Sequence, residues 1–361
     1  MERRIIGAKA RATPLPTAPV VVAAARSEAP QVSHVRIDEA SEGQRLDNFL
    51  VKHLKGVPKS HVYRVIRSGE VRVNKGRAEV STRLALGDEV RVPPVRVTDR
   101  TDVPAAPARE FPVVFEDEHL IALDKPAGVA VHGGSGVDFG VIEQLRQARP
   151  GAAFLELVHR LDKETSGLLL VAKKRAALVG LQEQLRAHGG EKSIAKTYSA
   201  LVTGHWPANR KVIDLALHKY VGADGERRVR VVDADHEAAK RSITLVKVVR
   251  AFAGFTLLDV TLKTGRTHQI RVHLAHAGHA IVGDPKYGDF ALNRSFARGA
   301  ALPGRRFERM FLHARGLRFE HPADGTTVRL EAPLPAECRL LLEALSAAAP
   351  APDSAPAPAP E

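Results

Sequence analysis

A cluster of prolines indicates a boundary between two separately folded parts of this chain. Four of them lie within residues 93–109. Proline fixes φ and removes a backbone hydrogen-bond donor, so this stretch cannot continue a helix or a central strand. We therefore expect a linker at residues 98–109 between a small front domain, residues 38–97, and a large rear domain, residues 110–346.

Both ends of the chain have compositions that do not favour a packed core. Residues 1–37 are rich in Ala, Pro, Arg and Val without helical or strand periodicity, and residues 347–361 are mostly Ala and Pro. Such segments bury too little apolar surface to offset the loss of chain entropy. We expect a disordered basic leader and a disordered extended tail.

Targeting signals and disulfides are not indicated. The apolar stretch near the start is interrupted by Pro14, Pro16 and Pro19, and no run approaches the ~18 apolar residues of a membrane span. The single cysteine, Cys338, cannot form an intramolecular disulfide. A reducing cytoplasmic location without a membrane partner is therefore expected.

The charge balance indicates a polyanionic partner. The chain has 54 Lys and Arg against 41 Asp and Glu, which gives a formal net charge of +13 and a pI near 10.0. Nucleic acid and anionic membrane surfaces are the partners that such a balance favours.

The front domain is predicted to be small and to contain a helix with a basic face. Apolar spacing predicts helices over residues 45–54 and 59–67, and Gly69 is expected to end the second helix in the left-handed conformation. Strands are predicted at residues 70–74 and 89–92. A single basic helix face is often only solvated, but the small size and the overall charge favour phosphate contacts. The candidate contacts are Arg45, Lys59, Arg64, Arg67, Arg72 and Lys75.

These front-domain runs resemble an S4-type RNA-binding domain. The resemblance is carried by Glu42 to Leu50, Lys59 to Arg64 and Gly69 to Lys75. It implies binding of structured RNA through backbone and shape.

Strand-like runs dominate the rear domain. A hairpin is predicted around residues 117–118, a buried strand at 168–172, a helix at 176–185 and further strands at 197–202, 244–249 and 255–262. The predicted fold class is α+β, with a mainly antiparallel mixed sheet.

Several common chemistries lack their motifs. The chain has no phosphate-binding Gly-x-x-x-x-Gly-Lys loop, no dinucleotide fingerprint after a strand and no Gly-x-Ser-x-Gly elbow. His268, His273, His276 and His279 lack the carboxylate partner that would complete a familiar metal motif. We expect no metal and no cofactor.

Two dense polar segments are candidates for chemistry. Asp162 lies between apolar runs within residues 157–170, where a carboxylate can act as nucleophile, base or ion-pair partner. From the residues alone, a charged hairpin turn is the favoured explanation. Arg266, within residues 264–274, can reach into a cleft or form a surface ion pair. Tyr198 is as suited to the core as to base stacking.

Together these segments resemble the RluA family of pseudouridine synthases. The matching pieces are Asp124 to Gly128 with Val131-His132, His159 to Gly167, Lys196 to Tyr198, Thr264 to Leu274 and Gly283-Asp284, all in family order. The resemblance implies the pseudouridine synthase fold and cofactor-free isomerisation of uridine in RNA.

The same resemblance implies roles for individual residues. Asp162 is the catalytic carboxylate, either as a nucleophile on the sugar or as a base at C2′. Arg266 pairs with Asp162, and Tyr198 lies against the detached uracil. Arg160 occupies the space that the target nucleotide vacates when it leaves its stack.

The front domain, placed before the synthase motifs, further implies 23S ribosomal RNA or a large-subunit precursor as substrate. Transfer RNA or mixed targets remain an alternative, as does a non-catalytic RNA-binding factor of ribosome assembly. No protein partner is expected, and a monomer is the default.

Overall fold

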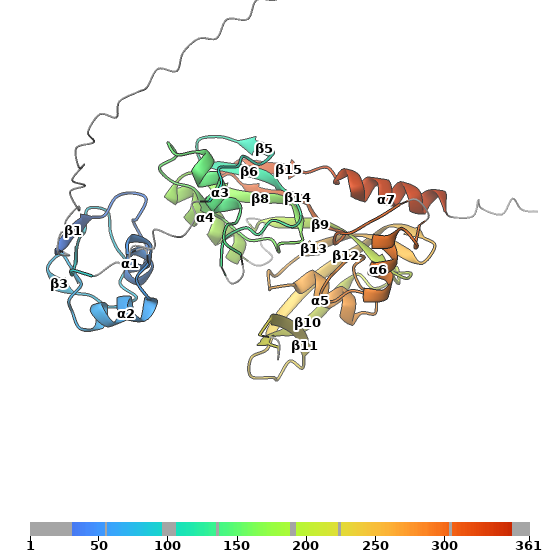
Figure 1. Ribbon diagram of the computed structural model, residues 1–361, viewed down its shortest axis with the longest axis horizontal. Helices are drawn as coiled ribbons and strands as arrows, with labels where there is room; N and C mark the ends of the chain where they lie inside the picture. The colour runs from blue at the N-terminus through green and yellow to red at the C-terminus, as the bar shows by residue number, and fades with distance from the viewer. Residues whose placement is uncertain are drawn as a thin grey trace, which may run out of the picture. The chain divides into compact units, whose positions relative to one another are not determined.

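The protein is described by a computed structural model over residues 31–54, 56–95, 106–134, 137–187, 193–222, 225–302 and 305–348. These residues form two compact units (Figure 1). The front unit contains residues 44–95 with the described residues up to 37, and the rear unit contains residues 38–43 and 106–348.

The front unit packs two helices on a small sheet. Its sheet has the order β1-β4-β2-β3 and is antiparallel throughout. Apolar residues of α1, among them Leu46 and Leu50, share one core with Val62 and Ile66 of α2. The elements are β1 (Ser33–Arg36), α1 (Leu46–His53), α2 (Lys59–Arg67), β2 (Arg72–Val73), β3 (Gly76–Arg77) and β4 (Glu89–Val92).

Local patterns in this unit were predicted well, except at its start. The second helix has the predicted bounds, and Gly69 has φ +79°. The leader predicted for residues 1–37, however, overlaps β1, which pairs with β4. Because Val35 and Ile37 are the inward residues of an otherwise polar run, the pattern is too short to be recognised without its partner strand.

The rear unit is built on an eleven-stranded sheet. Its main order is β11-β10-β12-β13-β9-β14-β8-β6-β5, with β15 beside β14 and β7 beside β8. Among these described strands, only β14 and β8 pair in parallel. The strands are β5 (Val113–Glu116), β6 (Leu120–Lys125), β7 (Glu156–Leu157), β8 (Ser166–Ala172), β9 (Ala195–Thr203), β10 (Val212–Val221), β11 (Arg227–Val232), β12 (Lys240–Phe252), β13 (Phe255–Leu262), β14 (Leu312–Glu320) and β15 (Thr327–Glu331).

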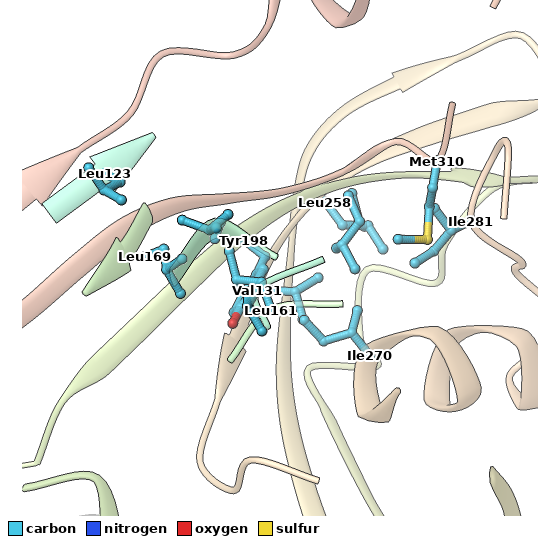
Figure 2. Packing of buried hydrophobic residues seen from close by; sticks show 14 of the residues in the cluster. Leu123, Val131, Leu161, Leu169, Tyr198, Leu258, Ile270, Ile281 and Met310 are labelled. Atoms are coloured by element: carbon cyan, nitrogen blue, oxygen red, sulfur yellow. The ribbon is translucent and has the colours of Figure 1, made fainter. Parts of the chain in front are cut away.

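Helices cover this sheet and complete its cores. They are α3 (Val141–Ala148), α4 (Arg175–Arg186), α5 (Gln269–His276), α6 (Phe290–Arg298) and α7 (Ala336–Ala347). The largest apolar cluster contains Leu161, Tyr198 and Ile270 (Figure 2). The predicted α+β class with a mainly antiparallel sheet is therefore confirmed.

The predicted linker and termini lie largely outside the described residues. Residues 1–30, 96–105 and 349–361 are not described. The tail predicted from residue 347 begins within α7, which ends at Ala347. Within the described residues, no helix combines the length and the apolar character needed to cross a membrane.

Candidate active site

A cleft of about 740 Å³ opens in the rear unit. It is lined by the loop after β7, the last turn of α4, the start of β9, and the residues that lead from β13 into α5. Asp162, Tyr198 and Arg266 all line this cleft, as does Arg160. The structure thus brings together the four residues that sequence analysis assigned to the reaction.

The loop that carries Asp162 is fixed by a buried ammonium group. Lys125, fully buried at the end of β6, donates through Nζ to the carbonyl oxygens of Pro126, Val129 and Lys163 at 2.8, 2.7 and 3.1 Å. Burial lowers the pKa of Lys125 to about 7. The Gly128 N–H also donates to the Lys163 carbonyl, at 2.9 Å, so this loop is held one residue after Asp162.

The other end of the loop is fixed by the parallel pairing of β8 with β14. Gly167 has φ +108°, and a Cβ atom there would overlap the Ala314 carbonyl. Only glycine therefore allows the two strands to approach this closely.

A buried hydrogen-bonded group reinforces this junction. Burial lowers the pKa of His313 to about 4, so the ring is neutral. The Ala332 carbonyl can only accept, so Nε2 of His313 donates to it at 3.2 Å and Nδ1 accepts from the Ser166 hydroxyl at 2.9 Å. Arg309 Nη2 donates to the same hydroxyl oxygen at 2.6 Å.

Asp162 is paired with Arg271, not with Arg266. Arg271 Nη1 donates to Asp162 Oδ2 at 3.0 Å. The expected pairing of Arg266 with Asp162 is thus corrected. The Arg266 side chain is exposed at the cleft, whereas Arg271 projects from the first turn of α5 and is only 5% exposed. Both arginines lie within residues 264–274, so the motif alone does not decide which side chain points at the carboxylate.

Arg271 is held in place by a second carboxylate. Its Nε and Nη2 donate to the two oxygens of Asp284, both at 2.8 Å, in a bidentate pair. Burial acts to raise the pKa of Asp284, but the hydrogen bonds and charge of Arg271 outweigh it and hold that pKa below its ordinary value. The Tyr287 ring lies 5.1 Å from the guanidinium carbon and adds a cation–π contact.

These groups make a preorganised cationic support for Asp162. Arg271 cannot turn away without leaving the buried Asp284 carboxylate unpaired. A signal for this pair was present in the sequence, because an arginine between Ile270 and Val272 on an apolar helix needs a buried partner.

The loop before α5 is closed by the buried side chain of Gln269. Its Oε1 accepts from the Arg266 N–H at 3.0 Å and from Thr264 Oγ1 at 2.9 Å, while Nε2 donates to Ile243 O and Thr244 Oγ1, both at 3.0 Å. The backbone that presents Arg266 is therefore rigid even though its side chain is exposed.

His268 and Tyr198 complete the floor of the cleft. His268 has φ +52°, and its Nε2 faces Asp162 Oδ2 at 3.9 Å. Nδ1 of His268 is hydrogen-bonded to the Tyr287 hydroxyl at 2.8 Å, and burial lowers the pKa of the ring. Burial, with the nearby charge of Asp162, raises the pKa of Tyr198, so its phenol is neutral.

The predicted contacts of the front unit lie just before α1, on α2, on β2 and in the turn between β2 and β3. Lys59, Arg64, Arg67, Arg72 and Lys75 are exposed. Arg45 differs, because its Nε and Nη2 donate to the buried carboxylate of Asp47 at 3.1 and 2.9 Å. Arg45 and Arg67 also line a second cavity, of about 520 Å³, within this unit.

Known families match both units. The profile described as RNA pseudouridylate synthase matches residues 119–276, and that of the S4 domain matches residues 44–90. The solved structure titled Human RNA Pseudouridylate Synthase Domain Containing 4 has a TM-score of 0.52 and 25% identity, and covers 65% of this chain and 93% of its own.

The chain belongs to the RNA pseudouridine synthase family, and it is an enzyme of that class with an S4 domain at its front. Over most of its length it is similar to ribosomal large subunit pseudouridine synthase C. The Escherichia coli (strain K12) protein of that name is 50% identical over 315 residues, which cover 86% of this chain and 95% of the relative. The Salmonella typhi protein is 48% identical and covers 89% and 98%. The family resemblance is thereby confirmed.

Proposed function

We propose that this protein isomerises uridine to pseudouridine in 23S ribosomal RNA. The observation that carries the mechanism is the Asp162 carboxylate at the cleft floor, held at 3.0 Å by an arginine that a second, buried carboxylate fixes. The similarity to ribosomal large subunit synthases supports the choice of RNA.

The proposed reaction begins at the sugar of the target uridine. The N1–C1′ bond breaks, with Asp162 acting on the sugar either as nucleophile or as base at C2′. The Arg271 guanidinium holds the carboxylate that both routes use in a fixed position. The detached uracil turns against Tyr198, C5 bonds to C1′, and the C5 proton is lost. No cofactor, metal or energy source enters this sequence.

The exposed cations of the protein are proposed to hold the RNA. Extrusion of the target uridine costs a few kcal/mol, and Arg160 at the cleft is suited to fill the vacated space. Arg266, exposed beside it, is proposed to contact the substrate rather than Asp162. In the front unit Lys59, Arg64, Arg67, Arg72 and Lys75 are proposed to contact phosphates, with Arg45 a weaker candidate because it is paired with Asp47.

The remaining expectations belong to the same proposal. The enzyme acts as a cytoplasmic monomer, with 23S ribosomal RNA or a large-subunit precursor as its partner and no membrane or protein partner. The front unit, with β1 added to the predicted residues 38–97, is proposed as the RNA-binding domain, 98–109 as the linker and the rear unit as the catalytic domain.

Tritium release tests the proposal directly. An unmodified 23S transcript labelled with tritium at uracil C5 is incubated with the protein or with Asp162→Asn. Release by the wild-type protein alone is the expected result, with RNA affinity of the variant within severalfold. Near-normal turnover by Asp162→Asn would refute the catalytic role. RNA binding without release by either protein would favour other RNAs, and then a non-catalytic binding factor.

A further inference from the structure

Lys196 is a cation of the cleft that takes no part in the ion pairs around Asp162. It lines the cleft at the start of β9 and is half-buried. Its ammonium group lies against the loop before α5, because a Cβ atom on Gly265 would be 3.5 Å from Nζ. Within the described residues it has neither a hydrogen-bond nor an ion-pair partner, so its donors remain for a ligand.

The position of Lys196 relative to Tyr198 suggests which part of the substrate it meets. The two residues are separated by one position on β9 and therefore lie on the same face. They pair with Leu262 and Val260 of the neighbouring strand, and Leu262 also lines the cleft. Their Cα spacing of roughly 7 Å is comparable to the length of a pyrimidine base with its exocyclic oxygens.

Tyr198 lies close to the Asp162 carboxylate, whereas Lys196 forms no ion pair with it among the described residues. Asp162 acts on the pKa of Tyr198, so the carboxylate and the phenol are close. For Lys196, burial is what lowers the pKa, and no carboxylate opposes it. Within the described residues, Lys196 therefore differs from Arg271, whose guanidinium is paired with two carboxylates.

Lys196 is less exposed than the cleft cations that are suited to contact RNA phosphates. Arg160, Arg186 and Arg266 line the same cleft but are exposed, as contacts to an RNA backbone in solvent require. A recessed ammonium in partly desolvated surroundings interacts more strongly with charge that forms inside the cleft.

We propose that Lys196 is a further catalytic residue, which donates to a carbonyl oxygen of the detached uracil and stabilises its negative charge. The inference rests on the proposed function and names the group that receives the leaving base.

The charge balance of the step requires such a group. When the N1–C1′ bond breaks, its electron pair leaves with the base, whose negative charge spreads over N1, O2 and O4. This holds whether Asp162 acts as nucleophile or as base at C2′. Lys196 transfers no proton: it stabilises the anion until C5 attacks C1′, after which C5 loses its proton and N1 gains one.

Single-turnover kinetics on the 23S transcript test the proposal. Lys196→Met removes the charge, and we expect the rate constant at saturating enzyme to fall about 10²-fold, as for the loss of one donor to a developing anion. The dissociation constant should stay within threefold, with an unchanged dependence on salt. Lys196→Arg keeps the charge and should lose less than tenfold. Lys211→Met makes the same charge change on an exposed loop outside the cleft and is expected to match the wild-type protein.

A leaving-group probe separates charge stabilisation from a structural role. A transcript made with 5-fluorouridine has a base that carries negative charge more readily. Because C5 of this base carries fluorine, the final proton loss cannot occur, so the rate measured is the disappearance of the target 5-fluorouridine from nuclease digests separated by chromatography. The ratio of wild-type to Lys196→Met rates for this step should shrink at least severalfold. An equal ratio for both transcripts would overturn the proposal in favour of a structural role.

Two further outcomes are decisive. A weaker affinity and a reduced salt dependence with an unchanged rate would identify Lys196 as a phosphate contact and overturn its catalytic role. An unchanged rate and affinity would overturn it as well. Absence of pseudouridine with the wild-type protein on any RNA would instead refute the proposed function itself.

Discussion

Arg64 and Arg67 on α2 of the front unit are exposed, whereas Arg271 on α5 of the rear unit is 5% exposed and lies between two carboxylates. In the proposed function, the exposed residues would contact solvated RNA phosphates, and each would contribute a small, salt-dependent share of binding. The buried guanidinium is already oriented before RNA arrives. The difference teaches that the same residue type supplies affinity in one unit and preorganisation in the other.

The largest expected effect follows from removing the charge of Asp284, the buried carboxylate that holds Arg271. Asp284→Asn removes the charge that anchors Arg271 without touching the substrate-facing carboxylate. Loss of one partner of a buried pair costs about 3–5 kcal/mol of folding free energy, and turnover should fall at least a hundredfold because Asp162 loses its fixed partner. Calorimetric unfolding and tritium release measure the two effects.

The exposed pair of Asp214 and Arg241 provides the matched control. Arg241 Nη2 lies 2.6 Å from Asp214 Oδ2, but the side chains are 74% and 40% exposed. Asp214→Asn should therefore leave both the unfolding temperature and turnover unchanged. Equal effects of the two substitutions would show that burial does not distinguish these pairs.

The pH dependence of stability sharpens the same contrast. The folded-state pKa of Asp284 is depressed, so its stabilising contribution is present above its unfolded pKa of about 4 and is lost as pH falls through the folded value. The stability difference between the wild-type protein and Asp284→Asn should thus be full near pH 7 and shrink below about pH 4. A difference that stays constant down to pH 2 would contradict this linkage.

A smaller effect is expected from the Tyr198 hydroxyl. Tyr198→Phe keeps the buried ring that packs with Leu161 but removes the hydroxyl, which we expect to help the loss of the C5 proton. Tritium release should slow by about 10²-fold, in the range of general acid–base catalysis, while the unfolding temperature changes little. Tyr198→Leu, which also removes the flat ring, is the comparison. Full tritium release by the Tyr198→Phe variant would show that the hydroxyl has no role.

The smallest effect is expected from a change to an exposed arginine of the front unit. Arg67→Gln should weaken RNA binding only severalfold and reduce the slope of log affinity against log salt by about 1, with no change in the rate at saturating enzyme. Arg67→Lys keeps the charge and serves as the control. Filter-binding titrations at several salt concentrations measure both, and a changed saturating rate would argue against a purely phosphate-binding role.

Sequence patterns predicted those parts of the fold whose causes are local. The bounds of α2, the left-handed Gly69 and the hairpin of β5 and β6 all follow from apolar spacing and turn residues within a few positions. By contrast, β1 needs a partner strand more than fifty residues away, so its short polar pattern could not identify it.

The candidate site shows the same limit. Asp162, Tyr198, Arg160 and Arg266 were assigned because they lie in motifs that resemble those of the RluA family, and all four line the cleft. The choice between Arg266 and Arg271 depended on side-chain direction at the start of α5 and on Asp284, which lies beyond the helix. The spacing of residues in the sequence does not show that Asp162, Arg271 and Asp284 come together.

The parallel contact of β8 with β14 also sets the order in which this enzyme matures. Ser166 and Gly167, which end the catalytic loop, pair with His313 and Ala314 across almost 150 positions of the chain. A contact so distant in sequence forms late, because the intervening chain must first be synthesised and closed into the sheet. A nascent chain that stops short of β14 contains Asp162, Tyr198 and Arg271 but lacks the strand that fixes the catalytic loop. Catalytic competence therefore arises near the end of synthesis, after nearly the whole rear unit has emerged.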